Sequence, residues 1–374
     1  MSVHSRNANP VVRKLQPYVP GPTAGEIHDR YGIALDQIVK LSSNEAPLGP
    51  SPKAREAIRH VAGGDDLHRY PSSAVPQLRA GIATTLGIQP GQVLPAAGSS
   101  TAWPMIVRAL SSAGDTVVWI DPSMTSYAEV AILSEREERS VATASPFDLN
   151  VDDVVRAAGA DAKVVFVSSP NNTTSRFVDP TTIEELAARI PDAVIVVDEH
   201  YIEAADDFRT ATAVSLIDSV PNVVVTRSFS KMYGLAGLRI GYVVGSDEAV
   251  KAIAPFRPNW SVNVIAEAAA RAALEDVDHL ERNIEATRDG REYLLKSLQS
   301  LDELEVISEP QGGFILFRAL ARPGAEVTEG LFRQGVMVRG DLLEGWIRVS
   351  VGTQSQNERF LEALTASLSD ASSS

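Results

Sequence analysis

The stretch that decides the fold is Ser228-Phe-Ser-Lys-Met-Tyr-Gly-Leu-Ala-Gly-Leu-Arg-Ile-Gly-Tyr242. Its single lysine, Lys231, follows Ser228 and Ser230 and precedes a glycine-rich turn that ends at Arg239. A lysine amine can condense with an aldehyde to form a Schiff base. Hydroxyls and a bidentate guanidinium can hold a phosphate, and glycines allow close backbone approach. The stretch therefore suits pyridoxal 5′-phosphate (PLP), which carries both groups. A lysine-containing loop without a cofactor is the alternative.

The length, composition and charge of the chain exclude several classes of protein. A chain of 374 residues predicts two or more domains. The formal net charge of −14 argues against a nucleic-acid surface. No apolar run approaches the ~20 residues of a membrane span. The first residues lack the apolar core of a signal peptide, so we expect a cytoplasmic protein. The absence of cysteine excludes disulfides and thiolate catalysis, and the six histidines show no metal-ligand spacing, so we expect no metal.

Short β-branched runs alternate with amphipathic stretches such as Thr181–Ala188. This alternation predicts an α/β fold whose mainly parallel sheet is covered on both faces. Ligands in such sheets bind beyond the carboxyl ends of the strands. The expected strands are Val93–Ala97, Thr116–Ile120, Val164–Ser168, Ala193–Val197, Val223–Arg227 and Ile240–Val244.

The C-terminal third predicts a smaller α+β unit. A long helical pattern covers about Ile265 to Leu301, and short strands then precede a final helix from about Ser355 to Ser367. The first ~50 residues are rich in proline and glycine, which is typical of an extended arm. We expect an arm over 1–50, a large domain over 51–255 and a small domain over 256–374. The expected small-domain strands are Glu305–Ser308, Gly313–Arg318, Val336–Arg339 and Trp346–Val351.

Two further motifs follow predicted strands. Asp198 ends a buried strand, where a carboxylate can pair with the pyridine nitrogen of PLP and keep it protonated. A helix N-cap is the alternative for this residue. Gly98-Ser-Ser-Thr101 joins a strand to a helix, whose free N–H groups can hold a phosphate, with Ser99 and Ser100 in the first turn. An ordinary capped helix explains that sequence equally well.

These motifs together resemble the fold-type I PLP-dependent aminotransferases, most closely the histidinol-phosphate aminotransferase branch. The resemblance runs from about Leu15 to Leu364. It implies a large domain with a seven-stranded type of sheet and a smaller α+β domain. It also implies that Lys231 holds PLP as an internal aldimine and then moves the substrate α-proton.

The resemblance assigns further residues to the cofactor and the substrate. Tyr201, in Asp-Glu-His-Tyr, and Asn172, in Pro-Asn-Asn-Thr, match residues that contact the 3′ oxygen of PLP, although a core tyrosine and a simple Asn turn are alternatives. Arg348 matches the arginine that binds the substrate carboxylate. Arg339 matches the position that holds the substrate phosphate, or else forms a surface salt bridge.

Other matched positions concern a partner subunit and the arm. Tyr70, in His-Arg-Tyr-Pro, resembles the tyrosine that reaches the cofactor phosphate of a neighbouring subunit, which implies a homodimer. Tyr18 and Asn44 lie in segments that resemble the family's N-terminal arm, which closes over the substrate. The expected partners are an amino acid and a 2-oxo acid.

Two substitutions depart from the family pattern on either side of the expected cofactor ring. Met124 stands where the family has a stacking aromatic, a role that Tyr127 could take instead. His200 replaces the alanine of Asp-Glu-Ala-Tyr and could stack on the ring, transfer protons or turn away. We therefore expect an aminotransferase. The alternatives are a PLP enzyme of oxidation, elimination/cyclisation or decarboxylation, and a non-enzymatic sensor.

Overall fold

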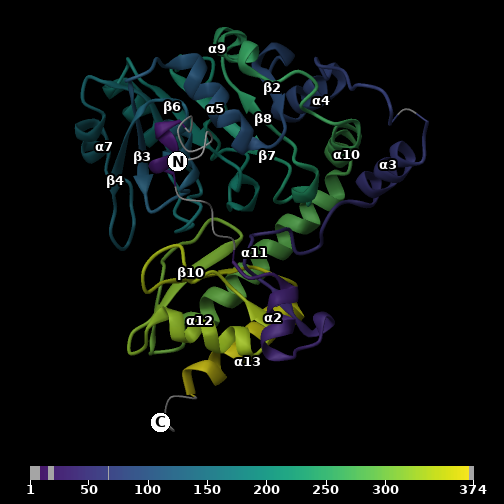
Figure 1. The fold of residues 1–374 in the computed structure, drawn as a ribbon, viewed down its shortest axis with the longest axis vertical. Coiled ribbons are helices and arrows are strands. Elements are labelled where there is room, and N and C mark those ends of the chain that lie inside the picture. Colours follow the sequence, from purple (N-terminus) through teal and green to yellow (C-terminus); the bar gives the residue numbers. More distant parts are fainter. Residues whose placement is uncertain (1–8, 16–20, 66, 370–374) are drawn as a thin grey trace, which may run out of the picture.

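The computed structural model describes residues 9–15, 21–65 and 67–369, and its centre is a seven-stranded sheet (Figure 1). The strand order is β2-β8-β7-β6-β5-β3-β4, and β8 runs opposite in direction to the other six strands of this sheet. The expected mainly parallel α/β sheet is thus confirmed. The strands are β2 (Val93–Ala96), β3 (Thr116–Asp121), β4 (Glu137–Ala142), β5 (Ala162–Ser168), β6 (Val194–Asp198), β7 (Val223–Ser228) and β8 (Gly241–Val244).

Both faces of this sheet are buried, because its central strands consist largely of apolar residues, with polar residues mainly at their carboxyl ends. On β7, Val223 and Val225 pack into one core, whereas Val224 packs into the core on the opposite face. Helices cover the first face with α3 (Pro52–Ala62), α4 (Pro76–Leu86), α7 (Val151–Ala158), α8 (Pro180–Arg189) and α10 (Val264–Leu274). The second face is covered by α5 (Ser99–Leu110), α6 (Ser126–Leu133) and α9 (Asp247–Ile253).

A smaller unit with its own core lies beside the sheet, and α11 runs from one to the other (Figure 1). Its antiparallel sheet has the order β12-β10-β9, and β1 pairs in parallel with β11. The strands are β1 (Val39–Lys40), β9 (Leu304–Val306), β10 (Phe314–Ala319), β11 (Val336–Met337) and β12 (Ile347–Ser350). The helices are α2 (Ala24–Tyr31), α11 (Val277–Gln299), α12 (Gly324–Arg333) and α13 (Gln354–Ser369).

The structure differs from the expected elements in three places. The long helix expected from Ile265 to Leu301 is two helices, because α10 ends at Leu274 and the backbone of Asp276 leaves the helical region at ψ 59°. The mostly polar strand β4 lacks the apolar pattern that marks the other strands. The arm contains helix α2, which begins with a capping box between Thr23 and Glu26.

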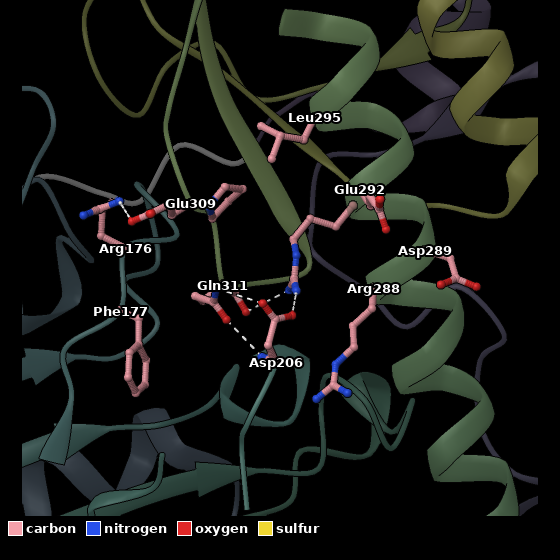
Figure 2. Close-up of a pocket in the computed structure, with 11 residues that line it drawn as sticks. Arg176, Phe177, Asp206, Arg288, Asp289, Glu292, Leu295, Glu309 and Gln311 are labelled. Atoms are coloured by element: carbon pink, nitrogen blue, oxygen red, sulfur yellow. Dashed lines mark hydrogen bonds and ion pairs between the residues drawn. The ribbon is translucent and has the colours of Figure 1, made fainter. Parts of the chain in front are cut away.

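A cavity, lined mostly by charged side chains, lies between α11 and the segments around Arg176 and Asp206 (Figure 2). Arg291 of α11 donates to the carbonyl of Ala204 at 2.7 Å and forms an ion pair with Asp206. Gln311 also contacts Asp206, so this region joins the loop after Tyr201 to the smaller unit. Short 3-10 helices occur at Pro10–Arg13, Leu35–Gln37, Pro90–Gln92, Ile202–Ala204, Ala213–Leu216, Ala236–Leu238 and Ala254–Phe256.

Neither a membrane helix nor a metal cluster stands out in the part of the chain that the structure describes. No helix there has the length and apolar character needed to cross a membrane. The same residues contain no group of three or more His, Cys, Asp or Glu side chains arranged to hold a metal ion.

Candidate active site

A cavity of about 540 Å³ opens where the carboxyl ends of the parallel strands face the smaller unit. This position follows from the fold, because loops leaving adjacent parallel strands converge at one edge of the sheet. Strand β8 runs the other way, so the turn preceding it reaches the same edge. Predicted site residues that line this cavity are Ser99, Ser100, Met124, Asn172, His200, Tyr201, Ser228, Ser230, Lys231, Arg239, Arg339 and Arg348.

One end of the cavity has the character of a phosphate site. Arg239 donates to the hydroxyl of Ser230 at 3.3 Å and to that of Ser100 at 3.4 Å. Gly98 is the N-cap of α5 and supplies no side-chain cap to the first N–H groups of the helix, which can therefore bind an anion. A Cβ atom on Gly98 would lie 2.6 Å from Nη2 of Arg239, and φ is 94° there. Glycine is therefore required at this close approach.

The middle of the cavity gathers the lysine and a phenol. Lys231 donates to the carbonyl of Ser43 at 3.0 Å, and its Nζ lies 5.1 Å from the centroid of the Tyr201 ring. The hydroxyl of Tyr201 accepts from the amides of Asn172 at 2.8 Å and Asn44 at 3.0 Å. The lysine, the phenol and both amides thus lie at one place, although they come from four separate segments.

Positively charged neighbours lower the pKa of the Tyr201 phenol. Its side chain is buried, and burial by itself raises the pKa of a phenol. The nearby Lys231, His200 and Arg348 outweigh burial, so the pKa of Tyr201 falls from 10.0 to about 7. A phenol of this kind can bear negative charge near neutral pH and accept hydrogen bonds strongly.

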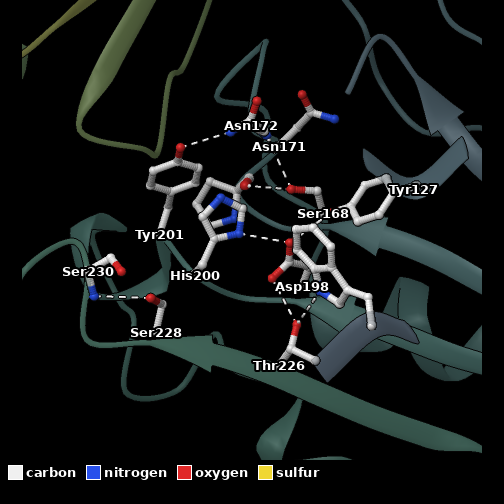
Figure 3. A network of polar contacts seen from close by, with 12 residues as sticks. Tyr127, Ser168, Asn171, Asn172, Asp198, His200, Tyr201, Thr226, Ser228 and Ser230 are labelled. Carbon is white, nitrogen blue, oxygen red and sulfur yellow. Dashed lines mark hydrogen bonds and ion pairs between the residues drawn. The ribbon is translucent and has the colours of Figure 1, made fainter. Parts of the chain in front are cut away.

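Asp198 is completely buried and lies beside His200, which lines the cavity (Figure 3). Its Oδ2 accepts from the hydroxyl of Tyr127 at 2.7 Å, and its Oδ1 accepts from that of Thr226 at 2.9 Å. Nδ1 of His200 lies 2.9 Å from Oδ2. Burial and the Asp198 carboxylate raise the pKa of Tyr127 well above its ordinary value, so Tyr127 remains a donor.

Two arginines form the wall nearer the smaller unit. Arg348, only 5% exposed, donates to the carbonyl of Asn172 at 2.8 Å and to that of Ser42 at 3.2 Å. Arg339 is joined to Arg348 by a backbone bridge and makes a bidentate ion pair with Asp341, with contacts of 2.6 and 2.8 Å. Both arginines line the same cavity as Lys231.

Three sequence-based assignments have other surroundings. Tyr70 does not line this cavity; it is 80% exposed and packs on Trp260, with ring centroids 4.8 Å apart. Tyr18 lies outside the described residues. Tyr127 does not reach over the cavity to replace Met124, because it is fully buried and stacks on Phe166 at 4.6 Å.

Sequence reasoning missed the groups that support the predicted ones. Thr226 was not identified although it lies on β7 beside Asp198, two residues before Ser228. Ser350 exchanges hydrogen bonds with Asn44 at 2.7 and 2.8 Å across 306 positions of the chain. The alternation of side chains along β7 could have pointed to Thr226, but no local signal links Ser350 to Asn44.

The residues present fit PLP as the cofactor. The donors at Ser100, Ser230 and Arg239 suit its phosphate, and the lysine amine suits its aldehyde. A buried carboxylate with one lone pair of Oδ1 open suits the pyridine nitrogen. The glycine at position 98 leaves the space next to the guanidinium that a side chain would fill.

Comparison with known proteins identifies the family. The model of the family described as aminotransferase class I and II matches residues 36–364. The chain belongs to this family. It is a PLP-dependent aminotransferase, and PLP is its cofactor.

This aminotransferase is similar to several relatives along almost its whole length. It is 38% identical over 363 residues to the histidinol-phosphate aminotransferase of Symbiobacterium thermophilum, which covers 96% of this chain and 98% of that protein. The enzyme of the same name from Methanothermobacter thermautotrophicus is 35% identical over 364 residues, with 94% of this chain and 95% of the relative covered.

Solved structures show that the aminotransferase has the fold-type I architecture. Histidinol-phosphate aminotransferase from Sinorhizobium meliloti, in complex with PLP, matches with a TM-score of 0.86 at 23% identity over 98% of both chains. L-threonine-O-3-phosphate decarboxylase from Porphyromonas gingivalis also matches, with a TM-score of 0.77 at 23% identity over 88% of this chain and 99% of that one. Because these two enzymes differ in reaction, this likeness concerns the fold alone.

Proposed function

We propose that this aminotransferase takes the amino group of histidinol phosphate, or of a closely similar phosphorylated amine, and passes it to a 2-oxo acid. The observation that carries the proposal is the pair Arg339 and Arg348, whose guanidinium groups line one wall of the cavity that holds Lys231. Both substrates are anions that would occupy this wall in turn. The names of the relatives from Symbiobacterium and Methanothermobacter support the same choice.

Each of these side chains has its own role in the proposed transamination. Lys231 takes the α-proton of the substrate and returns it, because its amine is the basic group that reaches the middle of the cavity. When bound, PLP supplies the electron sink that makes this proton acidic. Asp198 and Tyr201 hold the two polar positions of the cofactor ring. Arg348 orients the substrate. Its hydrogen bonds to the carbonyls of Asn172 and Ser42 fix the plane of its guanidinium group.

Arg339 provides the test of substrate class. Its partner Asp341 partly neutralises it, and a phosphate would compete with this carboxylate for the same donors. We expect Arg339→Gln to raise the KM for histidinol phosphate roughly 10- to 100-fold, because a hydrogen bond to a charged group is lost. The KM for phosphate-free histidinol should change little.

The measurement is steady-state transamination of both amines with a 2-oxo dicarboxylate as acceptor. Arg333→Gln is the matched control, because Arg333 is an exposed arginine on α12. Equal effects of Arg339→Gln on both amines would contradict phosphate recognition at this arginine. Oxygen uptake or carbon dioxide release without conversion of the 2-oxo dicarboxylate into its amino acid would contradict transamination itself and favour the alternative PLP reactions.

We also propose a homodimer in which Tyr70 reaches the cofactor phosphate of the partner subunit. The exposed pair of Tyr70 and Trp260 supports this, since large exposed aromatic groups are typical of interfaces. Mixing inactive Lys231→Ala with inactive Tyr70→Ala subunits should restore activity, because one hybrid site then has both side chains. No restoration in hybrids verified by native mass spectrometry would contradict the proposal.

The organisation into an arm over 1–50, a large domain over 51–255 and a small domain over 256–374 is likewise proposed. The separate cores of the two larger parts support two domains, although Ala266, Ala269, Ala270 and Ala273 of α10 belong to the core of the sheet-bearing part and favour a boundary after this helix. Helix α10 packs on α3 of the sheet-bearing part, so motion of the small domain would begin after this helix. A cytoplasmic location stays a prediction from the sequence.

A further inference from the structure

His200 occupies a position between the two polar ends of the cofactor site. It follows β6 closely and is 5% exposed. Its Nδ1 lies 2.9 Å from Oδ2 of Asp198, and its ring packs on that of Tyr201 with centroids 4.0 Å apart and planes at 48° (Figure 3). The imidazole is therefore held by contacts on two sides and does not turn away from the site.

Two hydrogen bonds to Asp198, together with Nδ1 of His200 at 2.9 Å, leave little freedom for additional donors. A carboxylate has about four lone-pair positions. Oδ2 faces both Tyr127 and His200, and Oδ1 faces Thr226. One position on Oδ1 is then left for the pyridine nitrogen of PLP. Any change in the charge of His200 acts directly on the carboxylate that the cofactor needs.

The surroundings of His200 combine opposing charges from several elements. Asp198 of β6 and Glu203 of the following 3-10 helix contribute carboxyl groups, and Lys231 contributes a positive charge. The phenols of Tyr127 and Tyr201 lie on the α6 side and the cavity side. Burial lowers the pKa of His200, but Asp198 and Tyr201 outweigh this and raise it.

The alanine found here in the family motif that this segment resembles has neither a hydrogen-bond donor nor a charge. We propose that His200 is a positioning residue that acts through Asp198. As a neutral imidazole it donates from Nδ1 and fixes the carboxylate. As an imidazolium it competes with the pyridine nitrogen of PLP for that carboxylate. The site thereby binds its cofactor less tightly at acidic pH.

The test measures the dissociation constant of PLP from the apoprotein by equilibrium dialysis between about pH 5 and pH 8. Wild type is compared with His200→Asn, whose amide can donate but cannot take up a proton. The ratio of the wild-type to the His200→Asn dissociation constant should rise about tenfold as the pH falls, since two like charges then share one carboxylate. A ratio that is constant with pH overturns the proposal.

His200→Ala separates the hydrogen bond from the charge. It should bind PLP about tenfold more weakly than His200→Asn at the alkaline end, because the donor to a buried carboxylate is missing. Equal affinities of the two variants there would overturn the positioning role. If His200→Ala fails to fold, His200→Asn still decides the pH dependence. His60→Ala is the control, since His60 is an exposed histidine on α3.

Reciprocity provides a second readout on the wild-type protein. If protonation of His200 weakens PLP binding tenfold, then bound PLP must lower the pKa of His200 by about one unit. Ring-carbon NMR of labelled histidine measures this pKa with and without PLP, using the signal that disappears in His200→Asn. An unchanged titration midpoint on saturation with PLP would show that His200 has only a structural role. Neither readout depends on which amine is the substrate.

Discussion

The buried carboxyl group of Glu203 should make the free energy of unfolding depend on pH. Its carboxyl is buried, 2% exposed, and its Oε1 lies 4.0 Å from Nη1 of Arg227, while its Oε2 has no hydrogen-bond partner among the described residues. Burial raises the pKa of Glu203 from 4.5 to about 7, although Arg227 opposes the rise. We therefore predict that Glu203→Gln gains stability relative to wild type as the pH increases.

The sign and size follow from proton linkage. Below about pH 4.5 the carboxyl is protonated in both the folded and the unfolded chain, so it has no effect on the pH dependence. Between about pH 4.5 and pH 7 the unfolded chain releases this proton and the folded chain keeps it, so wild-type stability falls as the pH rises. A pKa difference of about 2.5 units corresponds to roughly 3 kcal/mol. The glutamine of Glu203→Gln does not titrate, so this variant does not undergo that loss of folding stability.

Urea titrations of both proteins between about pH 4.5 and pH 7.5 provide the measurement. The difference in midpoint multiplied by the common m value gives the free-energy difference at each pH. Glu199→Gln is the matched control, because Glu199 binds Arg227 at 2.9 Å and accepts from Thr212 at 2.8 Å. This control should lose stability by several kcal/mol. A difference between Glu203→Gln and wild type that is flat with pH, or that reverses, would refute the reasoning.

Three further predictions concern the cofactor site. Lys231→Ala should retain no PLP after borohydride treatment and denaturation, whereas wild type should carry it on the Lys231 peptide by mass spectrometry. Gly98→Ala should weaken PLP binding at least tenfold in equilibrium dialysis, because its Cβ would lie 2.6 Å from Nη2 of Arg239; unchanged affinity would contradict the close approach. Since the pKa of Tyr201 is about 7, the apoprotein should show one tyrosinate signal by ultraviolet difference spectroscopy as the pH rises through neutrality. Tyr201→Phe should abolish that signal.

The fold was largely predictable, because most strands of the sheet have a recognisable apolar pattern in their local sequence. The expected run Val223–Arg227 became β7 with one additional residue, and Asp198 ends β6 as expected. A buried parallel strand needs apolar residues on both faces, so its sequence is distinctive. Strand β4 is exposed at most positions and carries no such pattern. The reversal of β8 depends on the turn through Arg239, which composition does not reveal.

The candidate site was predictable only where one motif holds the residues together. Lys231, Ser228 and Ser230 lie within four positions of one another, so their chemistry could be read from one stretch. The contact of Tyr127 with Asp198 was not predictable, because Tyr127 lies 71 positions away and reaches the carboxylate only after α6 packs on the sheet. Such contacts depend on tertiary packing, which no local pattern encodes.

The segment after β6 joins two electrostatic layers that the proposed experiments can separate. His200 contacts both Asp198 and Tyr201 beside the cavity, whereas Glu199 and Glu203 contact Arg227. A variant of the second layer should therefore change the pH dependence of unfolding and leave the pH dependence of PLP affinity intact. A variant of His200 should do the reverse. If Glu203→Gln instead altered PLP affinity with pH, the buried ion pair would have to act through His200, whose charge already influences Glu203. The two layers would then form one titrating unit.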